Sequence, residues 1–368
     1  MIYKKLIRPW LFEKDSEEIH DNVLRIGGKI AAIPGLHQIL KASLTVRDKR
    51  LEQKLFRMTF PNPVGLAAGM DKGGTALPLW KALSLGFIEM GGITANRQEG
   101  NPKPRLFRDP EDEALVNRMG FNNPGAEATA CHLSEIELPN VPLGINIGKS
   151  MSVAVDNMDA VIADYGFTFR RLYEYGDFFV LNVSSPNTPN LRQLQGKEFL
   201  KVLLEGIIEQ RLELAREYEG PVCPVLLKIA PDLSEQELDE ILEVAEHRVD
   251  GIVAVNTTLK PVGLKTTGAV RDEKGGWSGK PLQNQALQVV SYIHRRLPRL
   301  PIIGVGGIFS GEDAYRMVCA GASLIQIYTG LVYEGPCLPW RINKELLKLM
   351  KREGISSISE INGQTHHI

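Results

Sequence analysis

The chain has 368 residues, of which 43% are hydrophobic and 24% are charged, and its formal net charge at pH 7 is −1. This length accommodates one large α/β domain with a small appendage or two ordinary domains, and the composition is that of a folded protein rather than a disordered one. The near-neutral charge, without any block of like charge, argues against nucleic acid as the main partner.

The four cysteines are scattered and form no CxxC pair. The sequence therefore predicts no metal site, iron–sulfur cluster or disulfide framework, and a reducing compartment is the simplest interpretation. No apolar run approaches the roughly 20 residues that a membrane-spanning helix requires. The N-terminus also lacks the apolar region and cleavage site of a signal peptide.

Residues 1–45 differ from the rest of the chain because they show helical spacing of apolar residues and no clear strand. The apolar positions of the first predicted helix are Ile19, Val23, Leu24, Ile26 and Ile30. Asp15, followed three residues later by Glu18, resembles a capping arrangement that would start this helix. Pro34 and Gly35 are expected to end it, and a second short amphipathic segment then begins with Leu36, Ile39 and Leu40.

Two partners are considered for this extension. Short amphipathic helices cannot bury their apolar faces against each other alone, so they either pack on the main domain, which is the commoner arrangement, or lie on a membrane surface. A mixture of basic and large apolar residues suits a lipid interface, and it is found in Lys4, Lys5, Arg8, Trp10, Leu11 and Phe12.

From about residue 51 onward, apolar runs alternate with helical patterns, which is typical of βαβ units and a parallel sheet. Eight strands are predicted at 64–67, 87–90, 143–147, 178–182, 225–229, 251–256, 302–306 and 324–328. Helices are predicted at 199–218, 234–248, 282–296 and 311–319, and Ser234 with Glu237 forms a capping box. This pattern favours a (β/α)8 TIM barrel over a doubly wound sheet.

The segment from Thr94 to Pro124 is rich in Pro, Gly, Asn and Arg and has little periodicity. In a compact barrel, an insertion of this length is more often functional than idle.

Polar residues or glycines follow nearly every predicted strand, at the end where barrels carry their active sites. These groups are Ala68 to Lys72, Thr94, Asn146, Asn182 with Ser185, Lys228, Asn256 to Thr258, Gly306 with Gly307, and Tyr328 to Gly330. Their recurrence at one end of successive strands predicts a catalytic mouth.

Each group also has a simpler interpretation. Gly306 and Gly307 suit a backbone cradle for a phosphate, but glycines also permit tight turns. Lys228 suits a buried cation that stabilises negative charge on a cofactor ring, but a lysine also commonly leaves a strand for solvent. The side-chain amides of asparagines 117, 146, 182, 187 and 256 match the alternating C=O and N–H edge of a pyrimidine or other cyclic amide, although asparagine is also a routine turn residue.

No Ser-His-Asp order, HExxH motif or Walker loop is present, and the seven histidines are scattered. The candidates for a catalytic base are therefore Ser185, Lys72 and Lys228.

Seven motifs, in order along the chain, resemble those of the dihydroorotate dehydrogenase family. They are Ala67–Gly74, Asn117–Asn123, Gly144–Lys149, Asn182–Thr188, Asn256–Thr258, Ser278–Leu282 and Gly304–Ile308. Serine rather than cysteine at position 185, together with the helical extension, resembles the membrane-associated, quinone-dependent class 2 branch. The resemblance implies a division into an amphipathic membrane and quinone-access extension at residues 1–45 and an FMN-binding barrel at residues 46–368.

The resemblance also implies the ligands of the site. FMN would be held at its phosphate by Gly306, Gly307, Tyr328 and Thr329, and at its ring by Ala68, Gly69, Met70, Asp71, Lys72, Thr94, Asn146, Asn182, Lys228, Val255 and Gly279. Dihydroorotate would contact Lys72, Asn117, Arg118, Met119, Gly120, Phe121, Asn182, Asn187, Asn256 and Thr257. Lys72 suits the substrate carboxylate, and the asparagines suit its amide edges.

In this family Ser185 would remove the C5 proton while the C6 hydride passes to the flavin. A serine hydroxyl is a poor base, so it needs a proton relay, for which the resemblance indicates Thr188 and a water near Phe121. Pro186 restrains Ser185 to an extended conformation.

The resemblance also implies a role for the extension, as a lid that docks on the bilayer and admits ubiquinone or menaquinone. We accordingly expect a peripheral protein on the cytoplasmic face of the cell membrane, with His20 and Arg105 along the quinone tunnel. The chain departs from the family in the loop at 94–101, where three usual prolines are missing, so this loop is expected to be more flexible.

Two rival interpretations remain at the level of sequence. One is a soluble relative that uses fumarate or NAD, against which the serine at 185 and the amphipathic extension argue. The other is a non-enzymatic barrel that uses the phosphate cradle only to bind a ligand.

Overall fold

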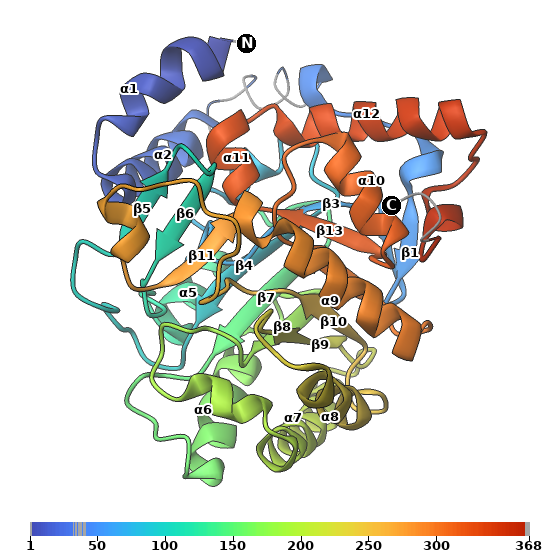
Figure 1. The fold of residues 1–368 in the computed structure, drawn as a ribbon. Coiled ribbons are helices and arrows are strands. Elements are labelled where there is room, and N and C mark those ends of the chain that lie inside the picture. The colour runs from blue at the N-terminus through green and yellow to red at the C-terminus, as the bar shows by residue number, and fades with distance from the viewer. Residues whose placement is uncertain (1, 32, 34, 36–38, 40–41, 365–368) are drawn as a thin grey trace.

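Eight parallel strands close into a barrel in the computed structural model, which describes residues 2–31, 33, 35, 39 and 42–364 (Figure 1). The strands are β3 (Val64–Leu66), β4 (Phe87–Ile93), β7 (Leu143–Gly148), β8 (Phe178–Asn182), β9 (Val225–Ile229), β10 (Gly251–Ala254), β12 (Ile302–Val305) and β13 (Leu324–Ile327). Their order around the barrel is β10-β12-β13-β3-β4-β7-β8-β9. The predicted (β/α)8 barrel and its eight strands are confirmed, with boundaries that differ by at most a few residues.

The N-terminal end of the barrel is sealed by aromatic rings. A hairpin of β1 (Gln53–Leu55) and β2 (Met58–Phe60) lies there, and the centroid of the Phe60 ring is 5.5 Å from that of Phe87. Inside the barrel, a Cβ at Gly65 would lie 2.3 Å from the Phe87 ring and one at Gly144 would lie 2.3 Å from the Phe178 ring. These glycines therefore make room for the rings, and only the C-terminal end remains open for ligands.

Helices surround the barrel, as Figure 1 shows. They are α4 (Leu77–Trp80), α5 (Ala126–Ser134), α6 (Met158–Leu172), α7 (Lys197–Glu217), α8 (Glu235–Ala245), α9 (Gln283–Arg296), α10 (Gly311–Cys319), α11 (Thr329–Glu334) and α12 (Leu338–Glu353). Short 3-10 turns lie at Lys49–Leu51, Leu191–Gln195, Ala269–Asp272, Lys280–Leu282 and Ile358–Ile361. The predicted capping box at Ser234 is confirmed, because Ser234 N donates to Glu237 Oε2 and Glu237 N donates to Ser234 Oγ.

A second sheet stands at the mouth of the barrel. It consists of β5 (Leu106–Asp109), β6 (Ala114–Asn117) and β11 (Gly276–Gly279), paired antiparallel in the order β11-β6-β5. Its hydrophobic side packs Ala114 and Val116 against Trp277, all of them buried. Two of these strands lie in the predicted insertion at 94–124, and the sheet brings Asn117 to the mouth.

The N-terminal extension packs on the barrel beside this sheet. It contains a π-helical turn (Tyr3–Ile7), α1 (Arg8–Phe12) and α2 (Ser16–Ala31). The predicted start of α2 is confirmed, since Asp15 Oδ1 accepts hydrogen bonds from the backbone N–H groups of Glu17 and Glu18. Tyr3 Oη donates to Val332 O at 2.6 Å, and the Phe12 ring lies edge-on to Tyr333. The predicted second helical segment, with Leu36 and Leu40, falls largely outside the described residues.

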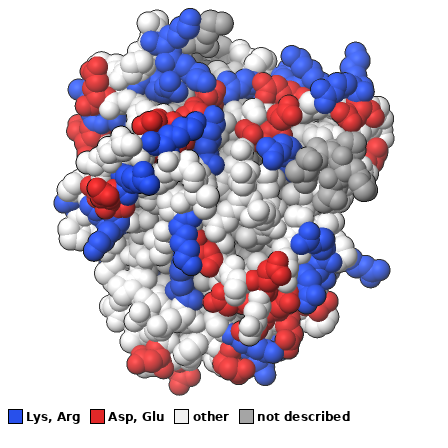
Figure 2. All heavy atoms as spheres, viewed as in Figure 1, with Lys and Arg blue, Asp and Glu red and all other residues white. Residues whose placement is uncertain are grey.

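The extension carries apolar side chains that the barrel does not cover. Ile2 and Leu6 are each 70% exposed. Trp10, which is 58% exposed, and Val23, Ile26 and Ile30 of α2 are also exposed, but they line a cavity between the extension and the barrel. Over the part of the chain that the structure describes, we find no helix with the length and apolar character of a membrane span. On the face shown in Figure 2, acidic and basic side chains are interspersed.

Candidate active site

One cavity at the C-terminal ends of the barrel strands gathers most of the residues that the sequence indicated. These lining residues are Ala68, Gly69, Lys72, Asn117, Met119, Gly120, Phe121, Asn146, Asn182, Ser185, Asn187, Lys228, Val255, Asn256, Thr257, Gly279, Gly306, Gly307, Tyr328 and Thr329. They come from all parts of the barrel and from the second sheet. The cavity, hereafter the mouth cavity, is the candidate active site.

Four other predicted residues make different contacts. Met70 lines a separate cavity below the N-terminal extension. Asp71 is fully buried and accepts from Thr75 N, Ala76 N and Trp80 Nε1, so it holds the turn that follows β3. Thr94 bonds to Asn96 O and to the Asn123 side chain. Arg118 directs its guanidinium to Glu273 and to the carbonyls of Pro104 and Lys274.

Lys72 is the cation on the sheet side of the mouth cavity. Its Nζ lies 3.3 Å from Met119 Sδ. Among the described residues, no carboxylate lies close enough to form an ion pair with it. Burial lowers the pKa of Lys72 to about 8, although nearby Glu17 acts in the opposite direction. A lysine in this setting can bind a ligand carboxylate and titrates close to neutral pH.

Lys228, at the opposite side, has a buried partner that the sequence analysis missed. Glu89 in β4 is fully buried, and its Oε1 lies 3.5 Å from Lys228 Nζ. The same carboxylate accepts from Asn146 Nδ2 at 2.7 Å and from Gln326 Nε2 at 2.5 Å. The sequence did contain a signal for this partner, because Glu89 is the single acid within the apolar run Phe87–Met90.

A chain of side-chain amides crosses the floor of the mouth cavity. Asn182 Nδ2 donates to Asn146 Oδ1 at 3.0 Å, and Asn256 Nδ2 donates to Asn182 Oδ1 at 3.3 Å. The hydroxyl of Ser184 also donates to Asn182 Oδ1. Three predicted asparagines, from β7, β8 and the loop after β10, are therefore held by one another.

Asn117 and Asn187 form a second pair at the rim. Asn187 Nδ2 donates to Asn117 Oδ1 at 3.1 Å, which links the loop after β8 to the second sheet. Asn101 Nδ2 donates to the carbonyls of Arg118 and Asn187, so the insertion also contacts this loop. The side chain of Phe121 closes this end, where Gly92 and Gly148 make room for it: a Cβ at either would lie 2.9 or 2.8 Å from its ring.

Ser185 lies on the loop that follows β8 and lines the mouth cavity. Its Oγ accepts from Asn187 N at 3.3 Å, and the side chain is largely buried. Thr188 Oγ1, three residues later, is buried and has no hydrogen-bond partner among the described residues. An unpartnered buried hydroxyl beside a candidate base is a fitting position for a bound water.

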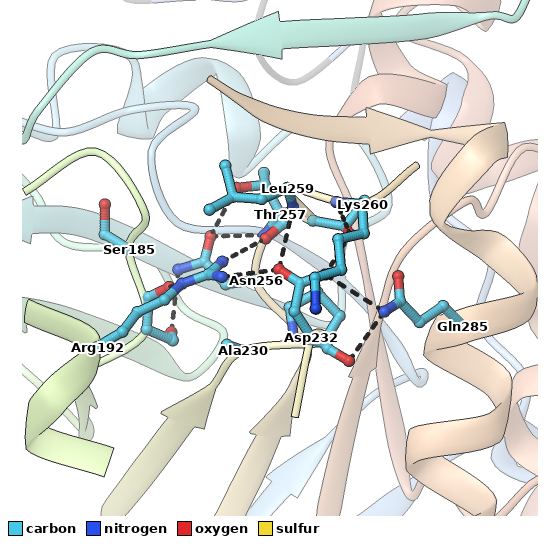
Figure 3. A network of polar contacts seen from close by, with 12 residues as sticks. Ser185, Arg192, Ala230, Asp232, Asn256, Thr257, Leu259, Lys260 and Gln285 are labelled. Atoms are coloured by element: carbon cyan, nitrogen blue, oxygen red, sulfur yellow. Dashed lines mark hydrogen bonds and ion pairs between the residues drawn. The ribbon is translucent and has the colours of Figure 1, made fainter. Parts of the chain in front are cut away.

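Arg192 holds the Ser185 loop from below, as Figure 3 shows. Its guanidinium donates to Ser184 O at 3.0 Å, to Thr257 O at 2.8 Å and to Asp232 Oδ2 at 2.7 Å. Burial would raise the pKa of Asp232, but hydrogen bonds from Thr258, Leu259 and Arg192 outweigh it and lower the pKa. Arg192 thus ties the residue before Ser185 to the loop after β10.

Gln285 completes this network, which the sequence analysis did not foresee. Its Nε2 donates to Pro231 O at 3.0 Å and lies 3.4 Å from Asp232 Oδ1, on the side of Asp232 away from Arg192 (Figure 3). Contacts to backbone carbonyls leave no pattern in a sequence, so Arg192 and Gln285 carried no signal.

The mouth cavity has the donor set that FMN requires. Gly306 and Gly307, with φ of 138° and 67°, line one end with backbone alone, and a Cβ at Gly307 would lie 2.4 Å from Gln283 Cβ. Gln326 lines the floor, and its Oε1 is buried without a partner among the described residues, so this oxygen is free to accept from a ring N–H. Lys228 adds a cation. These residues fit a phosphate at one end and a ring imide at the other.

A second cavity of about 730 Å³ lies between the N-terminal extension and the barrel. It is lined mainly by apolar side chains of α1, α2 and α4 and also by His20. Burial lowers the pKa of His20 to about 4, and the charge of Lys72 adds to this effect, so the ring is neutral at pH 7. Tyr328 lines both cavities and forms part of the wall between them.

Arg105, expected along a tunnel, is instead paired with the extension. Its guanidinium donates to both carboxylate oxygens of Glu17 in α2, at 2.7 Å for the shortest contact, and both side chains are buried. It also donates to Glu99 O and Asn101 O at 2.6 Å. Arg105 therefore fastens α2 to the insertion.

Comparisons with known proteins agree with one another. A family model described as dihydroorotate dehydrogenase matches residues 50–350. The chain is 48% identical to a dihydroorotate dehydrogenase (quinone) from Chloroflexus aurantiacus, over 94% of this chain and 96% of the relative. It is 44% identical to the protein of that name from Natronomonas pharaonis, over 98% of both. The crystal structure of an Eimeria tenella DHODH in complex with ferulenol is similar, with a TM-score of 0.85 and 32% identity over 96% of both chains.

Proposed function

The chain belongs to the dihydroorotate dehydrogenase family, and from this premise we propose that it oxidises dihydroorotate to orotate in pyrimidine synthesis, with FMN as cofactor and a membrane quinone as electron acceptor. The observation that carries the proposal is the mouth cavity, in which Ser185, Lys72 and the paired asparagines converge on one space.

Substrate binding is assigned to the polar rim. Lys72 would pair with the carboxylate of dihydroorotate, because no carboxylate of the described residues satisfies its charge at contact distance. Asn117, Asn187, Asn182 and Asn256 would meet the amide edges of the ring. Their mutual hydrogen bonds hold them in place before the substrate arrives, which reduces the entropy lost on binding.

FMN, when bound, would accept the C6 hydride of the substrate and later pass the electrons to the quinone. Lys228, Asn146 and Gln326 would hold its ring, and the backbone at Gly306 and Gly307 its phosphate. Both glycines are required where they stand, because their φ values disfavour other residues.

Ser185 would remove the proton from C5 of the substrate. The Asn187 N–H donates to its Oγ and Arg192 holds the preceding carbonyl, so two contacts fix the hydroxyl's position. A serine hydroxyl needs an onward acceptor, and the unpartnered hydroxyl of Thr188 supports a relay through water toward Phe121.

We assign the second cavity to the quinone and residues 1–45 to access from the membrane. The cavity is largely apolar and shares Tyr328 with the mouth cavity. The exposed apolar side chains of Ile2 and Leu6 would lie on the lipid surface, as expected of a peripheral protein on the cytoplasmic side of the membrane.

A visible absorption spectrum of the purified protein tests the proposal directly. We expect the yellow spectrum of a flavin, bleaching when dihydroorotate is added without oxygen, and recovery when a quinone analogue follows. Recovery with fumarate or NAD instead of the quinone would indicate the soluble type of relative. A protein that stays colourless after FMN is added would refute the flavoenzyme.

A further inference from the structure

Glu89 is a buried acid that touches neither cavity but contacts three residues of the mouth cavity. It is fully buried in β4, whereas Asn146, Gln326 and Lys228, which surround its carboxylate, all line the cavity floor. The contacts are 2.7 Å from Asn146 Nδ2, 2.5 Å from Gln326 Nε2 and 3.5 Å from Lys228 Nζ. One carboxylate is thus shared by three groups from three strands.

The first consequence concerns the orientation of the amides. A carboxylate only accepts hydrogen bonds, so the NH₂ groups of both Asn146 and Gln326 must face Glu89. The carbonyl of Asn146 therefore faces Asn182, whose NH₂ donates to it, and the carbonyl of Asn182 in turn faces Asn256. The hydrogen bonds that Glu89 accepts therefore determine which way the side-chain amides of Asn146, Asn182 and Asn256 are oriented.

The same rule determines what Gln326 offers to a ligand. Gln326 lines the cavity, and with its NH₂ group turned to Glu89, its buried Oε1 is left as an acceptor without a partner among the described residues. A glutamine not held in this way could present either a donor or an acceptor. Glu89 therefore selects the acceptor at this point of the floor.

The second consequence concerns charge. Lys228 Nζ and the Glu89 carboxylate lie close together in a buried region, where charges interact more strongly than in water. The pair places little net charge beside the ring, whereas Lys228 alone would place a full positive charge there. Since a positive charge favours the state of a flavin that holds two more electrons, the acid opposes reduction.

Stability does not explain the acid. A buried ion pair is weak evidence for stabilisation, and an apolar side chain of similar size often serves a barrel strand as well or better. The neighbouring residues Phe87, Ile88 and Met90 of β4 are apolar and fully buried. The contacts of Glu89 all lead to the mouth cavity, which indicates a role there.

We propose that Glu89 is a positioning residue of the flavin site, which lowers the reduction potential of the bound flavin by neutralising Lys228 and fixes the orientation of Asn146 and Gln326. The inference rests on the proposed function, because it requires a flavin in the mouth cavity.

The test is the midpoint potential of the flavin in Glu89→Gln, measured in the holoenzyme by equilibration with a reference dye. The substitution removes the negative charge and leaves Lys228 uncompensated, so we expect reduction to become at least tenfold more favourable, an upward shift of about 30 mV for a two-electron couple. The new glutamine side chain offers one acceptor and one donor, so the side-chain amide of either Asn146 or Gln326 must rotate to exchange its NH₂ group and its oxygen. A changed flavin absorption spectrum should accompany the shift in potential.

A matched control is Asp164→Asn. Asp164 in α6 is also a buried carboxylate, which accepts from Ser150 N at 2.7 Å, but among the described residues its hydrogen bonds reach none that line the mouth cavity. The same chemical change there should leave the potential at the wild-type value. An equal shift in both variants would mean that any buried acid has this effect and would overturn the proposal.

Removing one partner of a buried pair can prevent folding, so a second variant is needed. Glu89→Asp keeps the charge but withdraws it by one methylene from Lys228, and it should raise the potential by a smaller amount, at least a twofold change in the equilibrium. An unchanged or lowered potential in whichever variant folds would overturn the inference. A wild-type protein without flavin would instead refute the proposed function, and the two failures are thereby distinguished.

Discussion

Replacing Arg192 by lysine tests whether the network below the Ser185 loop controls catalysis. Lysine keeps the positive charge and can still pair with Asp232, but it cannot reach Ser184 O and Thr257 O at the same time. Each lost hydrogen bond costs about 1 kcal/mol, and more if the carbonyl stays buried without a partner, so the arrangement of the two loops should lose roughly 2 to 4 kcal/mol. At about 1.4 kcal/mol per tenfold in rate, we expect kcat/KM for dihydroorotate to fall about 10²-fold.

The assay is steady-state oxidation of dihydroorotate with a quinone analogue, together with the flavin absorption spectrum. Because the hydrogen bonds of Arg192 go to Ser184, Thr257 and Asp232 and not to the glycines that line the mouth cavity, flavin should stay bound while the rate falls. Arg170→Lys is the control: Arg170 forms exposed ion pairs with Glu213 and Glu217, which contribute little, so its rate should stay near that of the wild type. If Arg192→Lys keeps kcat/KM within about threefold of the wild-type value, the network does not position the base.

Three further predictions follow from the proposed function. Ser185→Ala should retain the yellow flavin but lose about 10²- to 10⁴-fold in kcat, and a near-normal rate would remove Ser185 from the mechanism. Because burial lowers the pKa of Lys72 to about 8, the lysine is charged below that pH and neutral above it, so kcat/KM for dihydroorotate should fall as the pH rises through about 8. A profile that is flat in this range, or the same fall in Lys72→Met, would contradict that assignment. Deleting residues 1–45 should release the protein from liposomes in a flotation assay, and continued binding would mean that another surface is the anchor.

The barrel strands could be predicted because a strand buried on both sides is a continuous apolar run, which stands out between helical patterns. The second sheet could not. Its strands β6 and β11 pair residues such as Val116 and Trp277, which lie far apart in the chain, and each strand is only four residues long. Neither length nor alternation separates such segments from a loop rich in turn residues.

Some residues of the candidate site could likewise be predicted from the sequence, and others could not. Residues on motifs at strand ends, such as Asn182 and Lys228, were found because strand ends of a barrel meet in one place. The residues that hold them were not predicted, since Arg192 acts on backbone carbonyls and Asp232 is a common turn residue. Glu89 was missed as well, although a lone acid in an apolar strand is conspicuous, because its partners could be known only from the fold.

The two cavities also explain how one protein could serve two chemically opposite ligands. The mouth cavity offers Lys72 and paired amides, which suit a polar anion, whereas the second cavity is lined mainly by apolar side chains of the N-terminal helices. A ligand suited to one would lose its favourable contacts in the other, so the substrate and the quinone need not compete for one space. Since Tyr328 belongs to both linings, a cofactor in the mouth cavity would lie against the wall of the second. In the proposed function, electrons would pass from one ligand to the other through this cofactor without contact between the ligands, and the charge that Glu89 and Lys228 place beside the cofactor would bear on both half-reactions.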